Sequence, residues 1–514
     1  MLTADTPVKH FDTQNGGSIK KPKDSAHKID RSKGSRLALD LSETKQNPIP
    51  MNLFSQIQTV NRVAIRLIAA VVILSTVTAT VAPPCFALPP EVQVLPQSRS
   101  KMSVIYGSTA GITNLFNENG DSEPIAAPFN LSLNSESFRK LDSRVGDLVN
   151  WLNNNSSYRY DETQRETSNR GVVLSDNSQL PLLGDALSRG NLGVEVEAHR
   201  SQYYLMYGRG LSEKISLAVV LPMIKQTVDI RHSLTGNNTA RDIYDGFAAS
   251  NVGAMTELVD TLKLLSSINT EDFQKLLESK GYSRISNRNE SAPGDLQIGT
   301  RFGYFPKRKI EAGFFSGDVG AAFQNTVTIP TGKLQPTSEL TGIDFGQGAW
   351  DTTLSHATHY SPRRSFTLLH GIQYTYRLPS SRLKRVRSHA GDFIPDASSE
   401  ENLTMNLGDK FATTLGARYR FNEVVSLDYS YEWAFKGKDV YTGSRSDSDY
   451  SYLSDGTDQR TEILTVMATF STVPLFLSGR FAAPGDFILS WNQPIRGKNS
   501  MIAPFGTAEL ALYF

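Results

Sequence analysis

The chain has 514 residues, of which 39 % are hydrophobic and 20 % are charged, and its formal net charge is +1. This length suits one large β structure or two to three ordinary domains, and the near-zero charge balance gives no reason to expect nucleic acid as a partner. The single cysteine, Cys85, lies in a segment that we expect to be removed. This excludes a disulfide framework or a cysteine-based metal site from the mature chain.

The N-terminal segment predicts export. Two arginines precede an apolar core from Leu67 to Ala82, and the small-residue pattern at residues 85–87 predicts cleavage after Ala87. This is the layout of a secretory signal peptide over residues 51–87. The alternative is an N-terminal membrane anchor, for which the core is short. Residues 1–50 are interpreted as a polar leader or a mis-assigned start.

Residues 88–192 form an N-terminal extension that is rich in Ser and Asn and shows little periodicity. One helix is predicted in it, from Ser135 to Asn155, because Val145, Leu148 and Leu152 recur at spacings of three and four. The rest of the extension is expected to be partly irregular.

Residues 193–514 alternate apolar and polar residues in repeated strand pairs. Segment 425–433, VSLDYSYEW, places Val, Leu, Tyr, Tyr and Trp on one face and Ser, Asp, Ser and Glu on the other. Segment 411–421 has the same alternation, and the three residues 422–424 between the two segments predict a tight hairpin. We count roughly eleven such strands. Bacterial barrels of a single chain have an even number, so a twelfth strand is expected from before residue 193, with totals of ten or fourteen as alternatives.

Short and long connections alternate along this region. Short turns are predicted near residues 208–214, 306–309, 361–364, 422–423 and 484–485, and longer polar connections at about 232–292, 332–349, 379–408, 439–458 and 495–502. Outer-membrane barrels show this asymmetry between their two ends, whereas sandwiches with Greek-key links do not require it. The predicted fold class is therefore all-β, a transmembrane antiparallel up-and-down β-barrel of about twelve strands. A secreted sandwich or propeller is the soluble alternative.

One long connection contains a predicted helical insert. Residues 241–280 suggest two helices, the first with Leu258, Leu262 and Leu265 on one face and the second capped near Asn269. By loop parity the insert is expected on the external side. It would serve there either as a lid over the mouth or as a small decorative subdomain.

The faces of the predicted strands supply the candidate functional residues. The terminal segment GTAELALYF is the barrel-closing strand, with Leu510, Leu512 and Phe514 on its apolar face, and the barrel-assembly machinery would engage it. Rings of charge set selectivity in wide pores, and inward ion pairs that fill a small barrel are the structural alternative. The candidates that are expected to face the lumen are Arg301, Arg377, Arg418, Arg420, Asp428, Glu432 and Glu509.

Five segments in order give the chain a family resemblance. They are YYLMYGRGLSEKISLAVVLPMI (203–224), GDLQIGTRFGYF (294–305), VTIPTGKLQ (327–335), FGQGAWDTTLSHATHYS (345–361) and QPIRGKN (493–499). Together with the terminal Phe, the chain from about residue 195 to 514 resembles the outer-membrane transporter-like family named for the meta-pathway of phenol degradation. The resemblance implies a β-barrel that transports small, often aromatic, compounds, and it carries over no catalytic or binding residues.

Enzymatic motifs are weak. Ser355, His356 and His359 lie in SHATHY, but two histidines three residues apart on a strand face opposite sides, which argues against a joint site. The basic run RLKRVRSH (382–389) lies in an inferred external loop, where it would contact lipopolysaccharide phosphates or remain solvated. We expect no enzyme activity, no metal and no cofactor.

The functional hypothesis is a channel in the cell outer membrane for passive uptake of small, aromatic or apolar solutes. Its expected partners are outer-membrane lipid with lipopolysaccharide and the solute itself. The alternative is a structural or surface-interaction barrel, with a plugged lumen, that acts through its external loops.

Overall fold

The computed structural model describes residues 92–514 with the exception of 142–143, 248–255, 311–315, 388–394, 447 and 449. The leader, the signal peptide and the cleavage site after Ala87 lie outside the described residues, so these expectations stay predictions.

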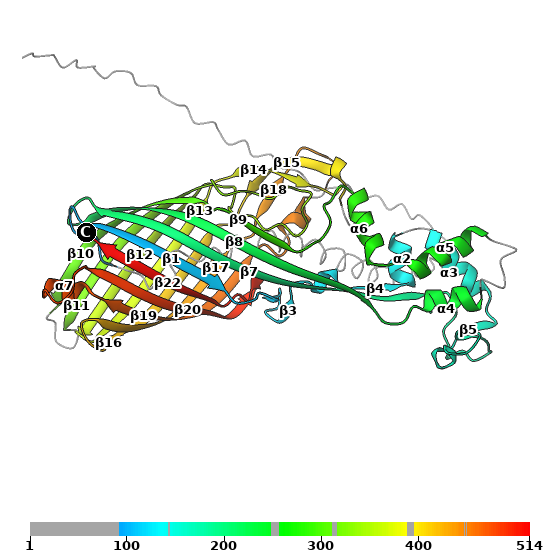
Figure 1. Ribbon diagram of the computed structural model, residues 1–514. Helices are drawn as coiled ribbons and strands as arrows, with labels where there is room; N and C mark the ends of the chain where they lie inside the picture. Colours follow the sequence, from blue (N-terminus) through cyan, green and yellow to red (C-terminus); the bar gives the residue numbers. More distant parts are fainter. Residues whose placement is uncertain are drawn as a thin grey trace, which may run out of the picture. The chain divides into compact units, whose positions relative to one another are not determined.

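Twelve antiparallel strands close into a barrel (Figure 1). The main sheet has 14 strands, of which β4 and β9 only extend its margins, and β7 pairs with both β1 and β8, so the remaining twelve form a ring. Closure leaves no edge strand to be capped. The predicted fold class and strand number are thus confirmed. The barrel strands are β1 (Ser100–Thr109), β7 (Ser188–Gly210), β8 (Ile215–Thr235), β10 (Leu296–Ile310), β11 (Gly317–Ile329), β12 (Asp351–Arg363), β13 (Phe366–Arg377), β16 (Lys410–Arg420), β17 (Val425–Lys436), β19 (Gln459–Ser471), β20 (Gly485–Lys498) and β22 (Phe505–Tyr513).

The first barrel strand lies inside the segment that the sequence assigned to an N-terminal extension. β1 pairs with the terminal strand β22, with Val104 opposite Leu510, and with β7 on its other side. The twelfth strand expected from before residue 193 is therefore β1. The predicted barrel boundary at 193 is wrong at this point, because β1 closes the ring and β7 itself begins at Ser188.

Connections of different length gather at the two ends of the barrel. One end, called the short-turn end, carries residues 211–214, 311–316, 364–365, 421–424 and 472–484. The other, called the long-loop end, carries residues 110–187, 236–295, 330–350, 378–409, 437–458 and 499–504. The last connection at each end departs from the predicted alternation, since 472–484 holds helix α7 (Val473–Leu477) and 499–504 is brief. The turn predicted at 306–309 is wrong, because β10 continues to Ile310.

Small elements are built from the long connections. They are the strands β2 (Asn114–Phe116), β3 (Ser122–Pro124), β4 (Leu131–Asn134), β5 (Tyr158–Tyr160), β6 (Val172–Leu174), β9 (Arg288–Pro293), β14 (Ser380–Arg385), β15 (Glu400–Asn406), β18 (Val440–Thr442) and β21 (Ser500–Met501), and the 3₁₀ helices η1 (Ala127–Phe129), η2 (Glu162–Gln164), η5 (Ala397–Ser399) and η6 (Ser451–Ser454). Strands β14, β15 and β18 form one three-stranded sheet, and β21, β2 and β3 form another.

Four helices from two separate stretches of the chain form one unit, which we call the helical unit. The β1–β7 connection supplies α2 (Ser135–Leu141) and α3 (Arg144–Asn154), and the β8–β10 connection supplies α4 (Thr239–Gly246) and α5 (Thr256–Ser267). The next helix, α6 (Thr270–Ser279), lies apart from this unit and contacts β8 (Figure 1). Buried side chains of α3, α4 and α5, among them Leu148, Ile243 and Leu262, belong to one apolar cluster. No helix in the described part of the chain is long and apolar enough to cross a membrane.

The sequence predicted these helices as two unrelated features. One helix was expected at 135–155 and the structure has α2 and α3 there, with residues 142–143 between them outside the described part; two were expected at 241–280 and the structure has three. The predicted cap is confirmed, since Asn269 Oδ1 accepts a hydrogen bond from the backbone N–H of Glu271 at 2.8 Å.

Candidate functional site

The two faces of the barrel wall differ in chemistry. On β16 and β17 the apolar side chains of Leu415 and Tyr429 are exposed, whereas Asp428 and Ser430 on the intervening positions are buried. Successive strand residues point to opposite faces, so in a closed barrel the exposed apolar set faces outward and the buried polar set faces inward. Exposed apolar side chains occur on every barrel strand, and one from each is Met102, Tyr203, Leu221, Ile298, Phe323, Leu354, Ile372, Leu415, Tyr429, Val466, Leu489 and Leu510.

The closing strand follows the same alternation. Leu510, Leu512 and Phe514 are all exposed, and Glu509 between them is only 2 % exposed. The Nζ atom of Lys101 on β1 lies 3.1 Å from Glu509 Oε1, which joins the first and last strands by an ion pair. Sequence reasoning missed Lys101 because it had not recognised β1, although SKMSVIYGST alternates like the other strands.

Near the short-turn end two of the three predicted inward charges pair with each other. Arg418 donates from Nε and Nη2 to the two carboxylate oxygens of Asp428, both at 2.7 Å. This bidentate geometry is the strongest form of such a pair. Arg420 donates to the carbonyl of Arg364 in the neighbouring turn at 3.4 Å.

Two further predicted residues, Arg301 on β10 and Glu432 on β17, lie elsewhere on the inner wall. Arg301 donates to Gln324 Oε1 from Nε and Nη2, at 3.1 and 2.8 Å, and from Nη1 to the carbonyl oxygen of Gln93 at 3.0 Å. Glu432 accepts a long hydrogen bond of 3.4 Å from Thr414. All seven predicted lumen residues therefore occupy the inward parity of their strands, and whether they set selectivity stays a prediction.

The described N-terminal residues lie against the inner wall near the short-turn end. A Cβ atom at Gly303 would come within 2.7 Å of Val94, and one at Gly208 within 3.2 Å of Leu95. Val92 is buried with Ala322 and is held in the same small apolar cluster. Because Gly208 and Gly303 have no side chain, the segment 92–95 can lie close to the inner wall. This segment narrows the lumen at that level.

At the long-loop end, residues 330–350 are bound into the mouth. Asp344 is 2 % exposed and receives two hydrogen bonds or ion-pair contacts from Arg382, at 2.7 and 2.8 Å. Asp295 accepts from the backbone N–H groups of Gln347 at 2.7 Å and Gly332 at 2.8 Å. Burial raises the pKa of Asp295, and these N–H groups oppose the rise by stabilising its charged form.

The basic run at 382–389 is not a solvated loop over its described part. Arg385 lies in β14 and donates to the carbonyls of Lys280 at 3.0 Å and Gly281 at 2.6 Å. The guanidinium of Arg387 stacks 4.6 Å from the ring centre of Tyr452. The expectation of a solvated stretch is wrong here, because Arg385 and Arg387 are buried against other connections of the long-loop end. Residues 388 and 389 lie outside the described part.

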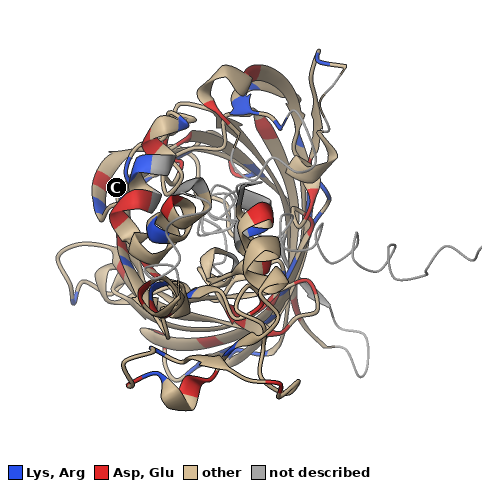
Figure 2. Ribbon diagram, turned by 90° about the vertical axis from the view of Figure 1, so that its right-hand side faces the viewer, with Lys and Arg blue, Asp and Glu red and all other residues tan. Residues whose placement is uncertain are grey.

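A second group of charges lies at the mouth, on strands β12, β13, β16 and β17. Arg377 at the end of β13 stands in register with Asp351, and Lys410 stands in register with Lys436. Lys436 Nζ lies 2.7 Å from Asp439 Oδ1. Figure 2 shows that basic and acidic residues are both spread around the barrel. Of this group the sequence had singled out only Arg377, because which charges become neighbours depends on strand register.

An apolar cavity of about 330 Å³ opens on the outer face of the wall beside β7, β8 and β10, since Val104, Tyr203 and Leu221 in its lining are exposed outward-facing side chains. It is lined by Val104, Tyr203, Tyr204, Leu205, Leu221, Pro222, Met223, Pro293, Gly294, Leu296 and Thr331. Its volume lies within the range of small-molecule sites, and most of its lining side chains are apolar.

The two histidines of SHATHY lie on opposite faces, as their spacing predicts. His356 Nε2 and Tyr304 OH are 2.5 Å apart, and Tyr304 stacks on the exposed ring of Phe323 on the outer face. His359 instead lies against Gly320 on the inner face. Among the described residues no group of His, Cys, Asp and Glu side chains is arranged to hold a metal ion.

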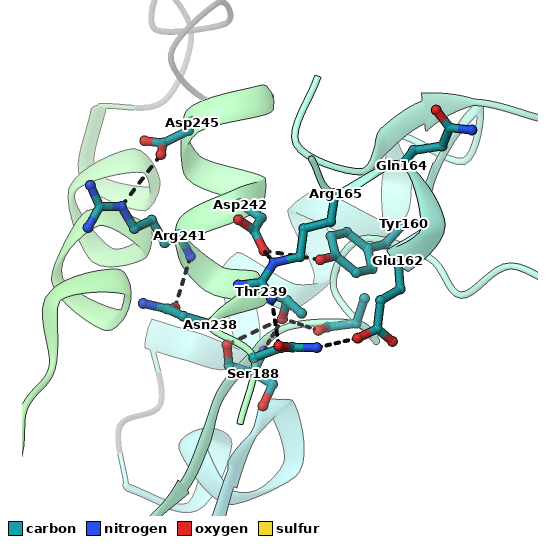
Figure 3. Close-up of polar contacts among 12 residues, drawn as sticks. Tyr160, Glu162, Gln164, Arg165, Ser188, Asn238, Thr239, Arg241, Asp242 and Asp245 are labelled. Carbon is teal, nitrogen blue, oxygen red and sulfur yellow. Dashed lines mark hydrogen bonds and ion pairs between the residues drawn. The ribbon is translucent and has the colours of Figure 1, made fainter. Parts of the chain in front are cut away.

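The helical unit has its own buried polar contact (Figure 3). Asp242 of α4 accepts from Arg165 Nε at 2.8 Å and from Tyr160 OH at 3.1 Å. Burial raises the pKa of Tyr160, and the neighbouring Asp242 carboxylate raises it further. Thr239 accepts from the backbone N–H of Ser188 at 2.8 Å. These contacts tie the β8–β10 insert to the β1–β7 connection.

Solved barrels with low similarity to this chain include several channels. The chain is similar to an outer membrane channel from Pseudomonas putida F1 (11 % identity, 83 % of this chain and 99 % of that one, TM-score 0.42). It is also similar to the P. putida toluene transporter TodX (9 %, 82 % and 91 %, 0.28) and to the CymD monoaromatic hydrocarbon channel (10 %, 82 % and 89 %, 0.27). All three TM-scores are below 0.5, and the barrel is established by the strand pairing of this chain alone.

No protein-family model matches the chain, and no curated protein matches it. The resemblance to the family named for the meta-pathway of phenol degradation therefore stays a prediction.

Proposed function

We propose that this protein is a channel of the cell outer membrane for passive uptake of small, aromatic or apolar solutes. One observation carries the proposal: the closed ring of strands exposes apolar side chains on its outer face and keeps its polar side chains on its inner face, the reverse of a soluble protein. Lipid requires every backbone group to find an internal partner, and a closed barrel meets that requirement. We also propose that the chain is a member of the outer-membrane transporter-like family named for the meta-pathway of phenol degradation.

The solute class rests on the resemblance of residues 195–514 to the outer-membrane transporter-like family named for the meta-pathway of phenol degradation. The apolar cavity beside β7, β8 and β10 does not bear on it, because its lining residues Val104, Tyr203 and Leu221 belong to the outward face of the wall.

Flux into vesicles tests the proposal. The purified chain is reconstituted in liposomes, and entry of labelled benzamide is measured against empty liposomes. Ala412 on β16 is partly exposed on the inward parity, and its neighbour Thr413 is partly exposed on the outward parity. We expect Ala412→Trp to narrow the lumen and slow entry, while Thr413→Trp leaves entry unchanged. No entry above that of empty liposomes, with a folded barrel, would sink the proposal.

A second candidate function is a surface-interaction barrel that acts through its long-loop end. The observation favouring it is the helical unit, which has its own apolar cluster and its own buried polar contact. Deleting residues 241–280 would expose that cluster, so surface variants of α5 are the cleaner test. Loss of a binding partner with unchanged benzamide entry would favour this candidate.

A further inference from the structure

Arg377 is buried at the mouth without a partner. The residue is 1 % exposed, and its Nε, Nη1 and Nη2 atoms are buried without a hydrogen bond. No described residue forms an ion pair with it. A guanidinium carries five N–H donors and stays charged in proteins. A buried cation with no acceptor is costly, and no acceptor of the described chain contacts these donors in the structure.

Two nearby carboxylates have other donors on one or both oxygens, although Asp439 Oδ2 is itself buried without a hydrogen bond. Asp439 Oδ1 accepts from the backbone N–H of Gly408 at 2.8 Å and contacts Lys436 Nζ at 2.7 Å. Asp409 accepts from Tyr374 OH at 2.5 Å and from the backbone N–H of Arg377 at 3.1 Å, which leaves the guanidinium itself unsatisfied.

Asp351 is the one carboxylate placed directly across from Arg377. The two residues are partners in the β12–β13 register, yet their charged groups form no ion pair. Within the described chain, Asp351 therefore does not neutralise Arg377 by direct contact.

Further cations share the same stretch of inner wall. Lys410 pairs with Thr375, two positions before Arg377 on β13, so Lys410 and Arg377 are diagonal neighbours on one face. Lys436 stands opposite Lys410 on the next strand. Against these three cations the mouth sets the three carboxylates Asp351, Asp409 and Asp439, so the charges balance in number, and the guanidinium of Arg377 is still left without a direct contact.

We propose that Arg377 is the centre of a carboxylate-binding site at the mouth of the barrel, with Lys410 beside it. The planar guanidinium fork fits the two oxygens of a carboxylate, and the neighbouring ammonium adds attraction without needing a fixed geometry. Because Arg377 is on the inward parity, the ligand is one that enters the lumen. Resting on the proposed function, the solutes are therefore aromatic carboxylates, whose ring is apolar and whose acid group meets Arg377.

Direct binding tests this inference separately from transport. The probe is benzoate, and benzamide is its neutral counterpart of nearly the same shape. Binding of each to the detergent-solubilised full chain is titrated by ligand-observed NMR at neutral pH. One charge-assisted pair is worth about 1.5–3 kcal/mol, so we expect benzoate to bind roughly tenfold or more tightly than benzamide.

Variants separate a binding role from a structural one. We expect Arg377→Gln to abolish the preference for benzoate and Arg377→Lys to keep part of it. The matched control is Lys438→Gln, which removes an exposed cation of the same mouth that is paired with Asp455, and its preference should equal that of the wild type. Retained migration of the unboiled protein on gels shows that each variant is folded. If Arg377→Gln does not fold, Arg377→Lys decides the question. Replacing the planar guanidinium by an ammonium should then lower the affinity for benzoate several-fold.

Two results would overturn the inference. One is equal binding of benzoate and benzamide to the wild type. The other is an unchanged preference in folded Arg377→Gln, with Arg377→Gln and Asp351→Asn lowering the unfolding temperature equally, as an internal pair would. Benzamide entry into liposomes reports on the proposed channel independently. Absent entry with intact benzoate binding would sink the channel and leave the site standing.

Discussion

Two leucines with nearly the same exposure lie in the two halves of this molecule. Leu415 on the barrel wall is 59 % exposed, and Leu264 on helix α5 is 58 % exposed. Leu415 belongs to a continuous apolar outer face with a polar interior behind it. Leu264 lies on a helix whose opposite side enters an apolar cluster. From these different contexts we expect Leu415 to face lipid and Leu264 to face water, although the two side chains are almost equally exposed.

The largest effect is expected in the apolar cluster of the helical unit. Leu262 of α5 is fully buried there, so Leu262→Ala should cost about 2–5 kcal/mol of that unit's stability through lost burial and a cavity. Limited proteolysis should then cut the β8–β10 connection, while the unboiled barrel still migrates as a folded species. Loss of the barrel together with the unit would show that the two fold as one.

A charge on the outer wall comes next. Leu415→Arg places a guanidinium in the middle of β16, and near the bilayer midplane this should cost about 2–4 kcal/mol. Urea unfolding of the chain in vesicles measures the change. An unchanged midpoint would contradict a lipid-facing wall.

The paired charges of the inner wall should matter to a smaller degree. Asp428→Asn removes the carboxylate that receives two hydrogen bonds from Arg418, and the expected loss is about 1.5–3 kcal/mol of barrel stability. The same urea titration applies. Stability equal to the wild type would mean that solvent in the lumen replaces the pair at no cost.

The smallest effect is expected at the matched leucine. Leu264→Arg adds a charge to a surface that faces water, so the unfolding free energy should change by less than about 0.5 kcal/mol. A loss as large as that of Leu415→Arg would erase the distinction between the two halves and place α5 in an apolar environment as well.

The barrel was predictable because its strands repeat with a period of two, which depends only on local sequence. Asp428 and Arg418 were recognised as inward residues from that period, and Leu510 and Phe514 as apolar ones on the closing strand. β1 was missed because the 110–187 connection separates it from every other strand, so it has no hairpin partner next to it in the chain.

The helical unit and the mouth could not be read from local pattern. Leu148 and Leu262 each indicate an apolar helix face. That the two faces pack on each other follows only from the pairing of β7 with β8, which brings the connection before β7 and the connection after β8 to the same end of the barrel. In the same way, Lys410 and Arg377 become neighbours through strand register across a connection of more than thirty residues. No periodicity in either strand encodes that register.

Tryptophan fluorescence with brominated lipids tests the membrane wall most directly. Trp491 lies midway along β20 on the outer face and is 48 % exposed, whereas Trp151 in α3 packs against Phe247 in the helical unit. Single-tryptophan variants that retain one or the other are reconstituted in vesicles with bromine on the acyl chains. The account predicts strong quenching of Trp491 and none of Trp151. An unquenched Trp491 in a folded barrel would contradict a wall that faces lipid.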